Sequence, residues 1–294
     1  MNTSSYLAPK KVLKFLSVLL VLVVFVVFMF PIYWIMTTAI RDRADLFANP
    51  PNLFPVSFTL DNFFAIFGAS TDATVATVIP RGGIMRFLTN SAIVTTISCT
   101  IALVIGTFGA YGLVRIDMPK KTKKNISFFI LSTRMLPPIS AAVPLFLIFS
   151  EIGLTNTYLG LIIAHTALNL AFVVWMMQGF LKDIPGEIHD AASVDGCGPL
   201  AGFLKVVLPL AAPGLVVTII FISIFSWNEF ALSLVLSGEG TRTIPVFIAS
   251  MWTSVQAAWG AMAAAAFVAT LPVLVLAIVV QKNLIKGLTF GAIK

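Results

Sequence analysis

The chain has 294 residues, of which 59% are hydrophobic, 12% are aromatic and only 11% are charged. Soluble globular domains carry about 25% charged residues, so the composition excludes an ordinary soluble protein and indicates an integral membrane protein. A net charge of +7 would favour a nucleic-acid partner in a soluble protein. Here the cations flank long apolar segments, and membrane topology explains them better.

Six apolar segments are long enough to cross a membrane, since about 20 helical residues span a hydrocarbon core of roughly 30 Å. The first is longer than the apolar core of a signal peptide, about 7–15 residues, and is interpreted as a retained helix. The sequence therefore predicts an all-α integral membrane protein with an N-terminal segment, 1–14, and a single transmembrane domain, 15–294. The six segments are residues 15–40, 87–114, 126–149, 158–181, 208–236 and 260–280.

Lysine and arginine are distributed unevenly between the two sides of these segments. If the N-terminus lies inside, 13 of them fall in cytoplasmic segments and 5 fall in external ones. Short cytoplasmic loops carry an excess of Lys and Arg. The distribution therefore predicts that both the N- and C-termini are cytoplasmic, and that the segment 183–207 is cytoplasmic too.

The first external segment, 41–86, is rich in Pro, Asn, Asp and Thr. It is interpreted as an ordered loop with short helices rather than as a domain. A second external segment, 237–257, contains Gly and Pro. Either segment is a candidate contact for an extracytoplasmic partner, or a simple connector.

A charged residue and two prolines interrupt the third apolar segment. Arg134 lies inside it, and Pro137 and Pro138 must break the helix because proline lacks a backbone N–H and clashes with the preceding turn. A broken helix with an intramembrane charge favours a substrate path, although Arg134 could instead extend to the inner headgroups. Asn169 and Gln178 in the fourth segment are weaker candidates for the same path.

The segment 183–207 is polar, although it lies between two long apolar segments. Ordinary helix connections have about 2–8 residues, and this one is several times longer. Glu187 favours the N-terminal end of a short helix, Ala191 and Ala192 leave room for close approach, and Gly196 can end the helix in a left-handed conformation. We expect two short helices that form a knob suited to a cleft in another protein.

The same segment resembles the cytoplasmic coupling loop of ABC importer permeases, whose pattern runs Glu-Ala-Ala, three residues to Asp-Gly, then Phe and Leu-Pro. The matching positions are Asp190, Ala191, Ala192, Asp195, Gly196, Phe203, Leu208, Pro209 and Pro213. Asp190 departs from the pattern, since the family more often has Glu there, and it shortens the reach of the carboxylate. The residues that we assign to ATPase coupling are Glu187, Asp190, Ala191, Ala192, Asp195 and Gly196.

Near the end of the fifth apolar segment stand Trp227, Asn228, Glu229 and Phe230. Sugars are bound by aromatic faces against their C–H surfaces and by amide or carboxylate groups on their hydroxyls. These residues supply both, and they resemble the Trp-Asn-Asp/Glu-Phe signature of carbohydrate ABC permeases, in which the equivalent stretch lies along the sugar path. We predict that Trp227, Asn228 and Glu229 line the path; the alternative is an interfacial aromatic belt with an acid at a helix end.

The resemblance covers nearly the whole chain and is closest to the shorter, maltose-importer-like permease subunit. The run 132–138 looks like members that import polyols. The resemblance implies a type I ABC importer permease fold in a bacterial inner membrane. It also implies a second related permease, two copies of a cytoplasmic ATPase and an extracytoplasmic solute-binding protein. The expected solute is an oligosaccharide, a monosaccharide or a polyol.

The chain is not expected to be an enzyme or to hold a cofactor or metal. It has no P-loop GxxxxGK[ST], so ATP and Mg would be bound by the partner ATPase. Three alternatives remain. One is an ABC permease for another solute such as glycerol phosphate. A second is an ion-coupled secondary transporter that uses Glu229, which leaves the segment 183–207 unexplained. A third is an intramembrane enzyme, which would need paired catalytic groups.

Overall fold

The computed structural model describes residues 7–69, 79, 82–252 and 258–290, and all regular elements in these ranges are helical. The predicted all-α class is therefore confirmed. The elements are α1 (Leu7–Ala39), α2 (Arg43–Leu46), α3 (Asp61–Ile66), α5 (Gly83–Arg115), α6 (Lys120–Thr133), α7 (Pro138–Glu151), α8 (Tyr158–Lys182), α9 (Gly186–Val194), α10 (Pro199–Gly202), the π-helical turn η1 (Phe203–Val207), α11 (Leu208–Leu210), α12 (Ala212–Trp227), α13 (Ala231–Leu236), α14 (Ile244–Ser250) and α15 (Trp259–Phe290).

The helices that can cross a membrane overlap the six predicted apolar segments, although the fifth begins at Pro199, inside the predicted loop 183–207, and ends at Trp227. In the described part of the chain, α1 from Val12, α5, α8 and α15 up to Val279 are each long and apolar enough. Two further pairs of helices are long and apolar enough only when each pair is taken together. They are α6 with α7, bent by 83°, and the stretch Pro199–Leu210 with α12, bent by 76°. Length and composition therefore allow up to six spans, two of them broken.

The predicted break in the third segment is present. Helix α6 ends at Thr133, Arg134 is its C-cap, and α7 begins at Pro138 after Pro137 as N-cap. Proline suits the first helical position because its missing N–H has no helical partner there. The two prolines therefore end one helix and start the next.

A continuous fifth helix over 208–236 is wrong, because the structure divides this segment into three helices. The first break is at Ala211, and the second lies between Trp227 and Ala231. At the second break the Glu229 carboxylate accepts hydrogen bonds from the backbone N–H of Leu232 (2.8 Å) and Ser233 (2.9 Å). An acid that satisfies free amides starts a new helix here, and hydropathy alone does not reveal it.

The chain divides into two compact units. Unit 1 is Met1–Gly83 with Met251–Val268, and unit 2 is Ile84–Ser250 with Ala269–Lys294. Unit 1 therefore holds α1, the residues that follow it up to Gly83, and the start of α15. Unit 2 holds most of α5, all elements from α6 to α14, and the rest of α15.

In unit 1, residues 41–69 contain the short helices α2 and α3, as predicted for this segment, and residues 70–78 and 80–81 lie outside the described part. The Asp45 carboxylate organises its first half. It accepts hydrogen bonds from Asn52 Nδ2 (2.7 Å) and Val56 N (2.9 Å) and lies 3.7 Å from Arg41 Nε. The hydrogen bond from Asn52, then that from Val56, lowers the pKa of Asp45, so the carboxylate stays ionised at neutral pH.

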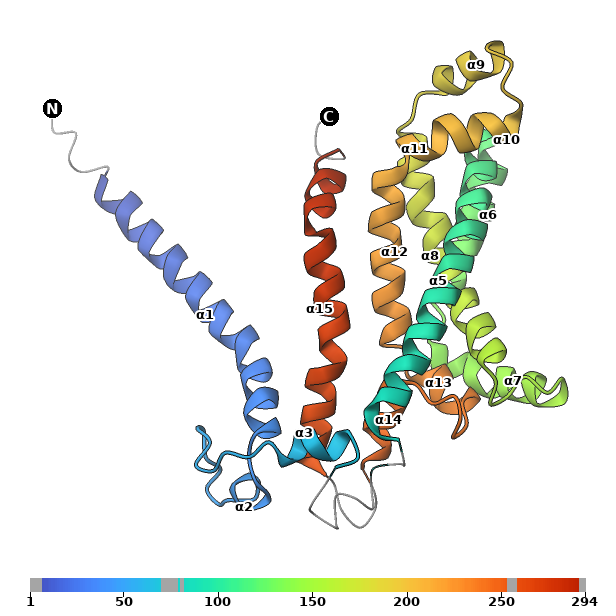
Figure 1. Cartoon of the computed structure of the whole chain (residues 1–294). Helices are drawn as coiled ribbons and strands as arrows, with labels where there is room; N and C mark the ends of the chain where they lie inside the picture. The colour runs from blue at the N-terminus through green and yellow to red at the C-terminus, as the bar shows by residue number, and fades with distance from the viewer. Residues whose placement is uncertain (1–6, 70–78, 80–81, 253–257, 291–294) are drawn as a thin grey trace, which may run out of the picture. The chain divides into compact units, whose positions relative to one another are not determined.

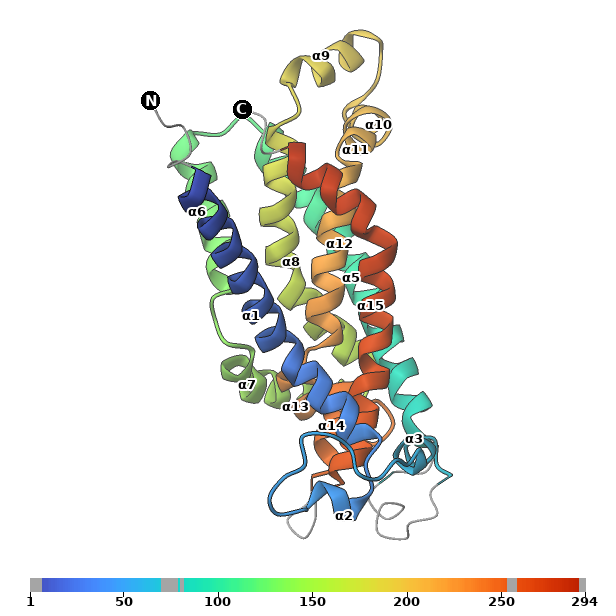
Figure 2. The ribbon, with the colours of Figure 1, turned by 90° about the vertical axis from the view of Figure 1, so that its left-hand side faces the viewer.

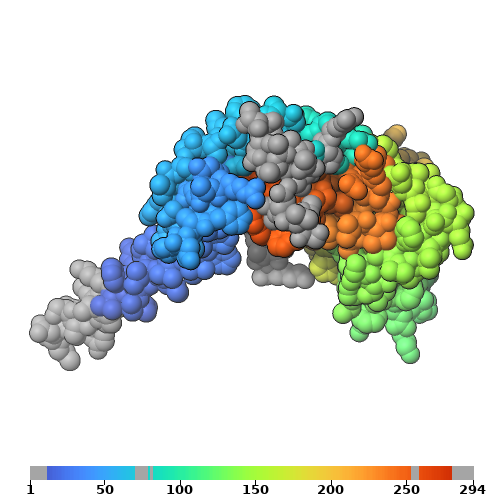
Figure 3. All heavy atoms as spheres, turned by 90° about the horizontal axis from the view of Figure 1, so that it is seen from below, coloured from blue at the N-terminus to red at the C-terminus, as the bar shows by residue number. Residues whose placement is uncertain are grey.

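In unit 2, α8 packs against α12 and α6. Small residues allow close helix contact: a Cβ at Gly106 would lie 2.6 Å from Val173 Cγ1, so α5 and α8 meet only because this position lacks a side chain. Helices α9, α10 and α11 lie at one end of unit 2, and α7 and α13 lie at the other (Figures 1 and 2). Figure 3 faces the second end, where α7 and α13 are in contact.

Candidate functional site

Helix α9 has the boundaries that the sequence pattern predicts. Pro185 is its N-cap, Glu187 lies in its first turn, and Asp195 is its C-cap. Gly196 follows with φ of 85°, the left-handed conformation that glycine adopts readily. Gly198 then caps α10. The knob of two short helices is therefore present between α8 and α12 (Figure 2).

One face of α9 is packed against the rest of unit 2. Ala192 is buried, and the His189 ring lies 6.0 Å from the Tyr111 ring of α5. Phe203 in η1 is buried beside the same tyrosine, with ring centroids 4.4 Å apart, and beside Phe108, at 5.0 Å. These ring contacts connect α9 and η1 to α5.

The opposite face of α9 is exposed. Glu187, Asp190, Ala191 and Val194 occupy it at spacings of three and four residues, which place them on one side of a helix. The Asp190 side chain is 83% exposed and Val194 is 87% exposed. Asp195 and Gly196 are exposed just beyond it. Of the six predicted coupling residues, only Ala192 points inward.

A cavity of about 520 Å³ lies in unit 2 where the break between α6 and α7 and the break between α12 and α13 meet the middle of α8. It brings together four predicted path residues from three parts of the chain. Its polar lining residues are Arg134, His165, Asn169, Ser226, Asn228 and Glu229, and its aromatic lining residues are Phe225 and Phe230. Its size falls within the range of about 300–1,000 Å³ that is typical of small-molecule pockets.

Arg134 is held inside this arrangement. Its Nη1 donates a hydrogen bond to the Leu168 carbonyl oxygen at 2.7 Å, and its guanidinium lies 4.6 Å from the Phe225 ring centroid. A second ring, that of Phe172, lies 6.0 Å away. Cation–π contacts of this kind hold a guanidinium flat against an aromatic face. The side chain therefore contacts α8 and α12, and it lines the cavity.

Asn169 adds a buried acceptor. The residue is only 2% exposed. Its Nδ2 donates to the His165 carbonyl oxygen at 3.0 Å, while its Oδ1 has no hydrogen-bond partner within the described residues. A buried polar atom without a partner costs free energy. A solute hydroxyl that donates a hydrogen bond to Asn169 Oδ1 would therefore be stabilised in the cavity.

Glu229 lines the cavity, but its carboxylate is already engaged. Besides the two backbone donors of α13, it accepts the Ser233 hydroxyl at 2.9 Å and lies 3.5 Å from His165 Nε2. His165 also hydrogen-bonds Ser226 (2.8 Å) and Ser233 (3.1 Å). This buried network holds the break between α12 and α13 in place. Sequence patterns do not reveal this network, because the residues that contact the His165 ring lie more than 60 positions away.

Trp227 is separated from its neighbours in the motif. Its Nε1 donates to the Ala269 carbonyl oxygen at 3.1 Å. The ring lines a different cavity of about 260 Å³, between α5, α12 and α15. Asn228 stays at the larger cavity, where its Nδ2 donates to the Ile224 carbonyl oxygen at 2.8 Å. The Trp-Asn-Glu-Phe sequence therefore faces two cavities, because the helix ends after Trp227.

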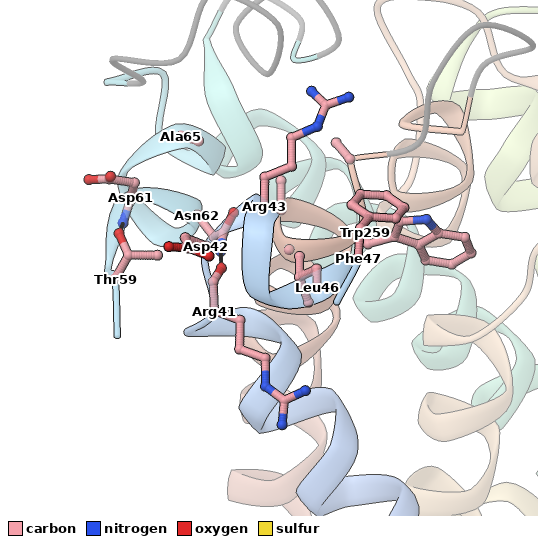
Figure 4. A pocket seen from close by; sticks show the side chains of 13 residues that line it. Arg41, Asp42, Arg43, Leu46, Phe47, Thr59, Asp61, Asn62, Ala65 and Trp259 are labelled. Carbon is pink, nitrogen blue, oxygen red and sulfur yellow. Dashed lines mark hydrogen bonds between the residues drawn. The ribbon is translucent and has the colours of Figure 1, made fainter. Parts of the chain in front are cut away.

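A third cavity lies in unit 1 between α2, α3 and the start of α15 (Figure 4). Its volume is about 150 Å³, which is below the usual range of about 300–1,000 Å³ for small-molecule pockets. Arg41 and Arg43 at its edge point in opposite directions (Figure 4). We therefore exclude it as a solute site.

Comparison with known proteins agrees with this arrangement. Residues 102–289 match the family described as binding-protein-dependent transport system inner membrane component. The trehalose transport system permease protein SugB of Mycobacterium tuberculosis is 34% identical over 270 residues, which cover 90% of this chain and 92% of SugB. The probable ABC transporter permease protein y4oR of Sinorhizobium fredii is 31% identical over 266 residues, 90% of each chain.

A solved structure shares the fold. It is a chain of a bacterial ABC transporter involved in the import of the acidic polysaccharide alginate, with a TM-score of 0.75, 19% sequence identity, and coverage of 97% of this chain and 99% of that one. The predicted type I importer permease fold is thereby confirmed. The chain belongs to the family of binding-protein-dependent transport system inner membrane components, the non-enzymatic permease subunits of ABC importers.

Proposed function

We propose that this protein is the permease subunit of an ATP-driven importer that carries a sugar or sugar-like solute, an oligosaccharide, monosaccharide or polyol, into the cytoplasm. The observation that carries the proposal is the exposed outer face of α9, at the end of unit 2 opposite to α7 and α13. A membrane permease needs such a surface only if another protein drives it.

The solute chemistry follows from the cavity at the helix breaks. Phe225 and Phe230 offer aromatic faces, Arg134 offers donors, and Asn169 Oδ1 offers an acceptor. Arg134 and Glu229 are the charged lining residues, and their formal charges cancel. This balance favours a neutral polyhydroxylated solute over a phosphorylated one such as glycerol phosphate. The transport of trehalose by the SugB system supports the same class.

The partners follow from the family. A second related permease completes the translocation path, two copies of a cytoplasmic ATPase bind ATP and Mg, and an extracytoplasmic solute-binding protein delivers the solute. With both termini in the cytoplasm, α9 faces the ATPases. Glu187, Asp190 and Asp195 are its contact carboxylates, while Ala191 permits close approach.

The transport step is mechanical. ATP binding closes the ATPases and displaces α9. His189 and Phe203 pass this displacement to Tyr111 on α5, and the permease opens outward to receive solute. Hydrolysis in the partner resets it. An ion-coupled mechanism through Glu229 is disfavoured, because three hydrogen bonds already hold its carboxylate.

Co-purification tests the assembly. The full chain, tagged at its C-terminus and extracted from its native membrane, should bring with it an ATPase, a second permease and a binding protein, identified by mass spectrometry. Gly196→Pro should lose the ATPase, because proline fixes φ near −65° whereas Gly196 has φ of 85°. Proline cannot adopt this φ and lacks the N–H that Gly196 donates to the Ser193 carbonyl oxygen, so the turn after α9 must change shape.

Gly198→Ala is the matched control for Gly196→Pro. Gly198 has φ of −63°, and an added Cβ would meet nothing within 4 Å, so this variant should retain every partner. Purification of the wild-type chain without any ATPase, under conditions that keep the second permease, would refute the coupling role of α9.

A further inference from the structure

An uncharged stretch of unit 1 presents large apolar side chains to the outside. No residue between Asp45 and Asp61 is charged. Within this stretch the exposed fractions are 60% for Leu53, 74% for Phe54, 79% for Val56 and 71% for Phe58. An exposed apolar group of this size marks an interaction surface.

The backbone that carries these side chains is fixed. Tyr33 Oη and Arg41 Nη2 both donate to the Leu53 carbonyl oxygen, at 2.9 and 3.0 Å. Val56 N donates to the Asp45 carboxylate, and Thr59 N donates to the Ile40 carbonyl oxygen at 2.8 Å. The exposed apolar side chains therefore project from a backbone that is held in place by hydrogen bonds.

Phe54 extends an aromatic cluster at the Ala39 end of α1. The Phe54 ring packs edge-on against Tyr33 at 6.4 Å, and Phe30 lies 6.5 Å from Tyr33 and 6.0 Å from Trp34. Tyrosine and tryptophan gather where a membrane meets water. No residue in the most apolar stretch of α1 is buried within this chain. The exposed segment therefore adjoins the exposed apolar surface of α1.

We propose that residues 53–58 are an interfacial anchor that inserts Phe54, Val56 and Phe58 into the headgroup and acyl boundary of the leaflet at the Ala39 end of α1. Lipid is the occupant that fits, because the exposed side chains at 53, 54, 56 and 58 are apolar, no residue from 46 to 60 is charged, and the stretch adjoins the Tyr33 and Trp34 rings near the end of an apolar span. The anchor would set the depth of unit 1 in the membrane. The proposal requires only that α1 crosses the membrane, so it can be tested independently of transport.

Depth-dependent quenching tests the anchor. Cys99 and Cys197 are free thiols, so a bimane label is placed at Phe54→Cys in a chain with Cys99→Ala and Cys197→Ser. The whole transporter is reconstituted in phosphatidylcholine nanodiscs that contain lipid with a nitroxide either near the headgroup or near the chain end. Interfacial segments bury about 5–10 Å into the boundary, so the shallow nitroxide should quench the label about twice as strongly as the deep one, and aqueous iodide should quench it little.

Asp61→Cys, at the charged end of the stretch, is the matched control and should be quenched by iodide and by neither lipid. Val56→Cys repeats the test if Phe54→Cys does not fold. Strong iodide quenching at position 54 or 56 would overturn the proposal. Protection from iodide and from both nitroxides would also overturn it, since another protein subunit would then cover the segment.

Discussion

Replacing Ala191 with arginine should abolish solute uptake while leaving the permease folded and inserted. Ala191 lies in the middle of the exposed face of α9, between Asp190 and Val194. Its methyl group lets the helix backbone lie close to a partner surface, and a long arginine would hold the two apart. A clash of about 3 kcal/mol lowers the population of the productive complex about 100-fold.

Ala191→Ser is the matched control, because serine keeps the side chain short, and it should transport at the wild-type rate. The measurement is the initial rate of labelled solute uptake, with ATPase activity and the elution volume in detergent recorded on the same preparations. Uptake near the wild-type rate in Ala191→Arg would mean that this face of α9 does not meet the ATPase.

Replacing Arg134 with alanine should lower uptake about 10- to 100-fold, since a hydrogen bond to a charged group contributes about 1.5–3 kcal/mol. Arg134 supplies the cationic donors of the cavity and is held against Phe225. Arg134→Lys should recover only part of the rate, because an ammonium group does not reproduce the planar stacking of a guanidinium.

Met135→Ala is the control for loss of side-chain volume, since Met135 follows Arg134 and is largely exposed. The concentration dependence of uptake separates weaker solute binding from slower turnover, and thermal unfolding reports stability. A wild-type uptake rate in Arg134→Ala would remove the residue from the solute path. Normal solute affinity with a much lower unfolding temperature would assign it to the fold.

Local signals in the sequence predicted the local features correctly. Pro137 and Pro138 break a helix wherever they stand, and Gly196 was expected to turn the chain because only glycine adopts its conformation freely. Long apolar runs identified the spanning helices because the hydrocarbon core fixes their length. Each of these features depends on a few neighbouring residues.

Features that depend on distant residues were predicted less well. Hydropathy extends the fifth helix through Glu229, because it registers neither the capping of the amides three and four residues later nor the contact of this carboxylate with His165, 64 residues earlier. Trp227 was grouped with Asn228, although the helix end turns its ring towards α15. Ala192 matched the coupling pattern but supports the knob from inside. The pattern located these sites, while packing decided the direction of each side chain.

The most direct test of the account is a photo-reactive amino acid at position 194, in cells that express the complete transporter. Val194 is the most exposed large apolar residue of α9, and the account predicts that the photo-reactive group cross-links to the cytoplasmic ATPase. A group placed at Phe54 in the same chain should not. Cross-linking from position 194 to the extracytoplasmic binding protein would contradict the proposed topology. Cross-linking to no subunit of an otherwise intact complex would contradict the coupling role of α9.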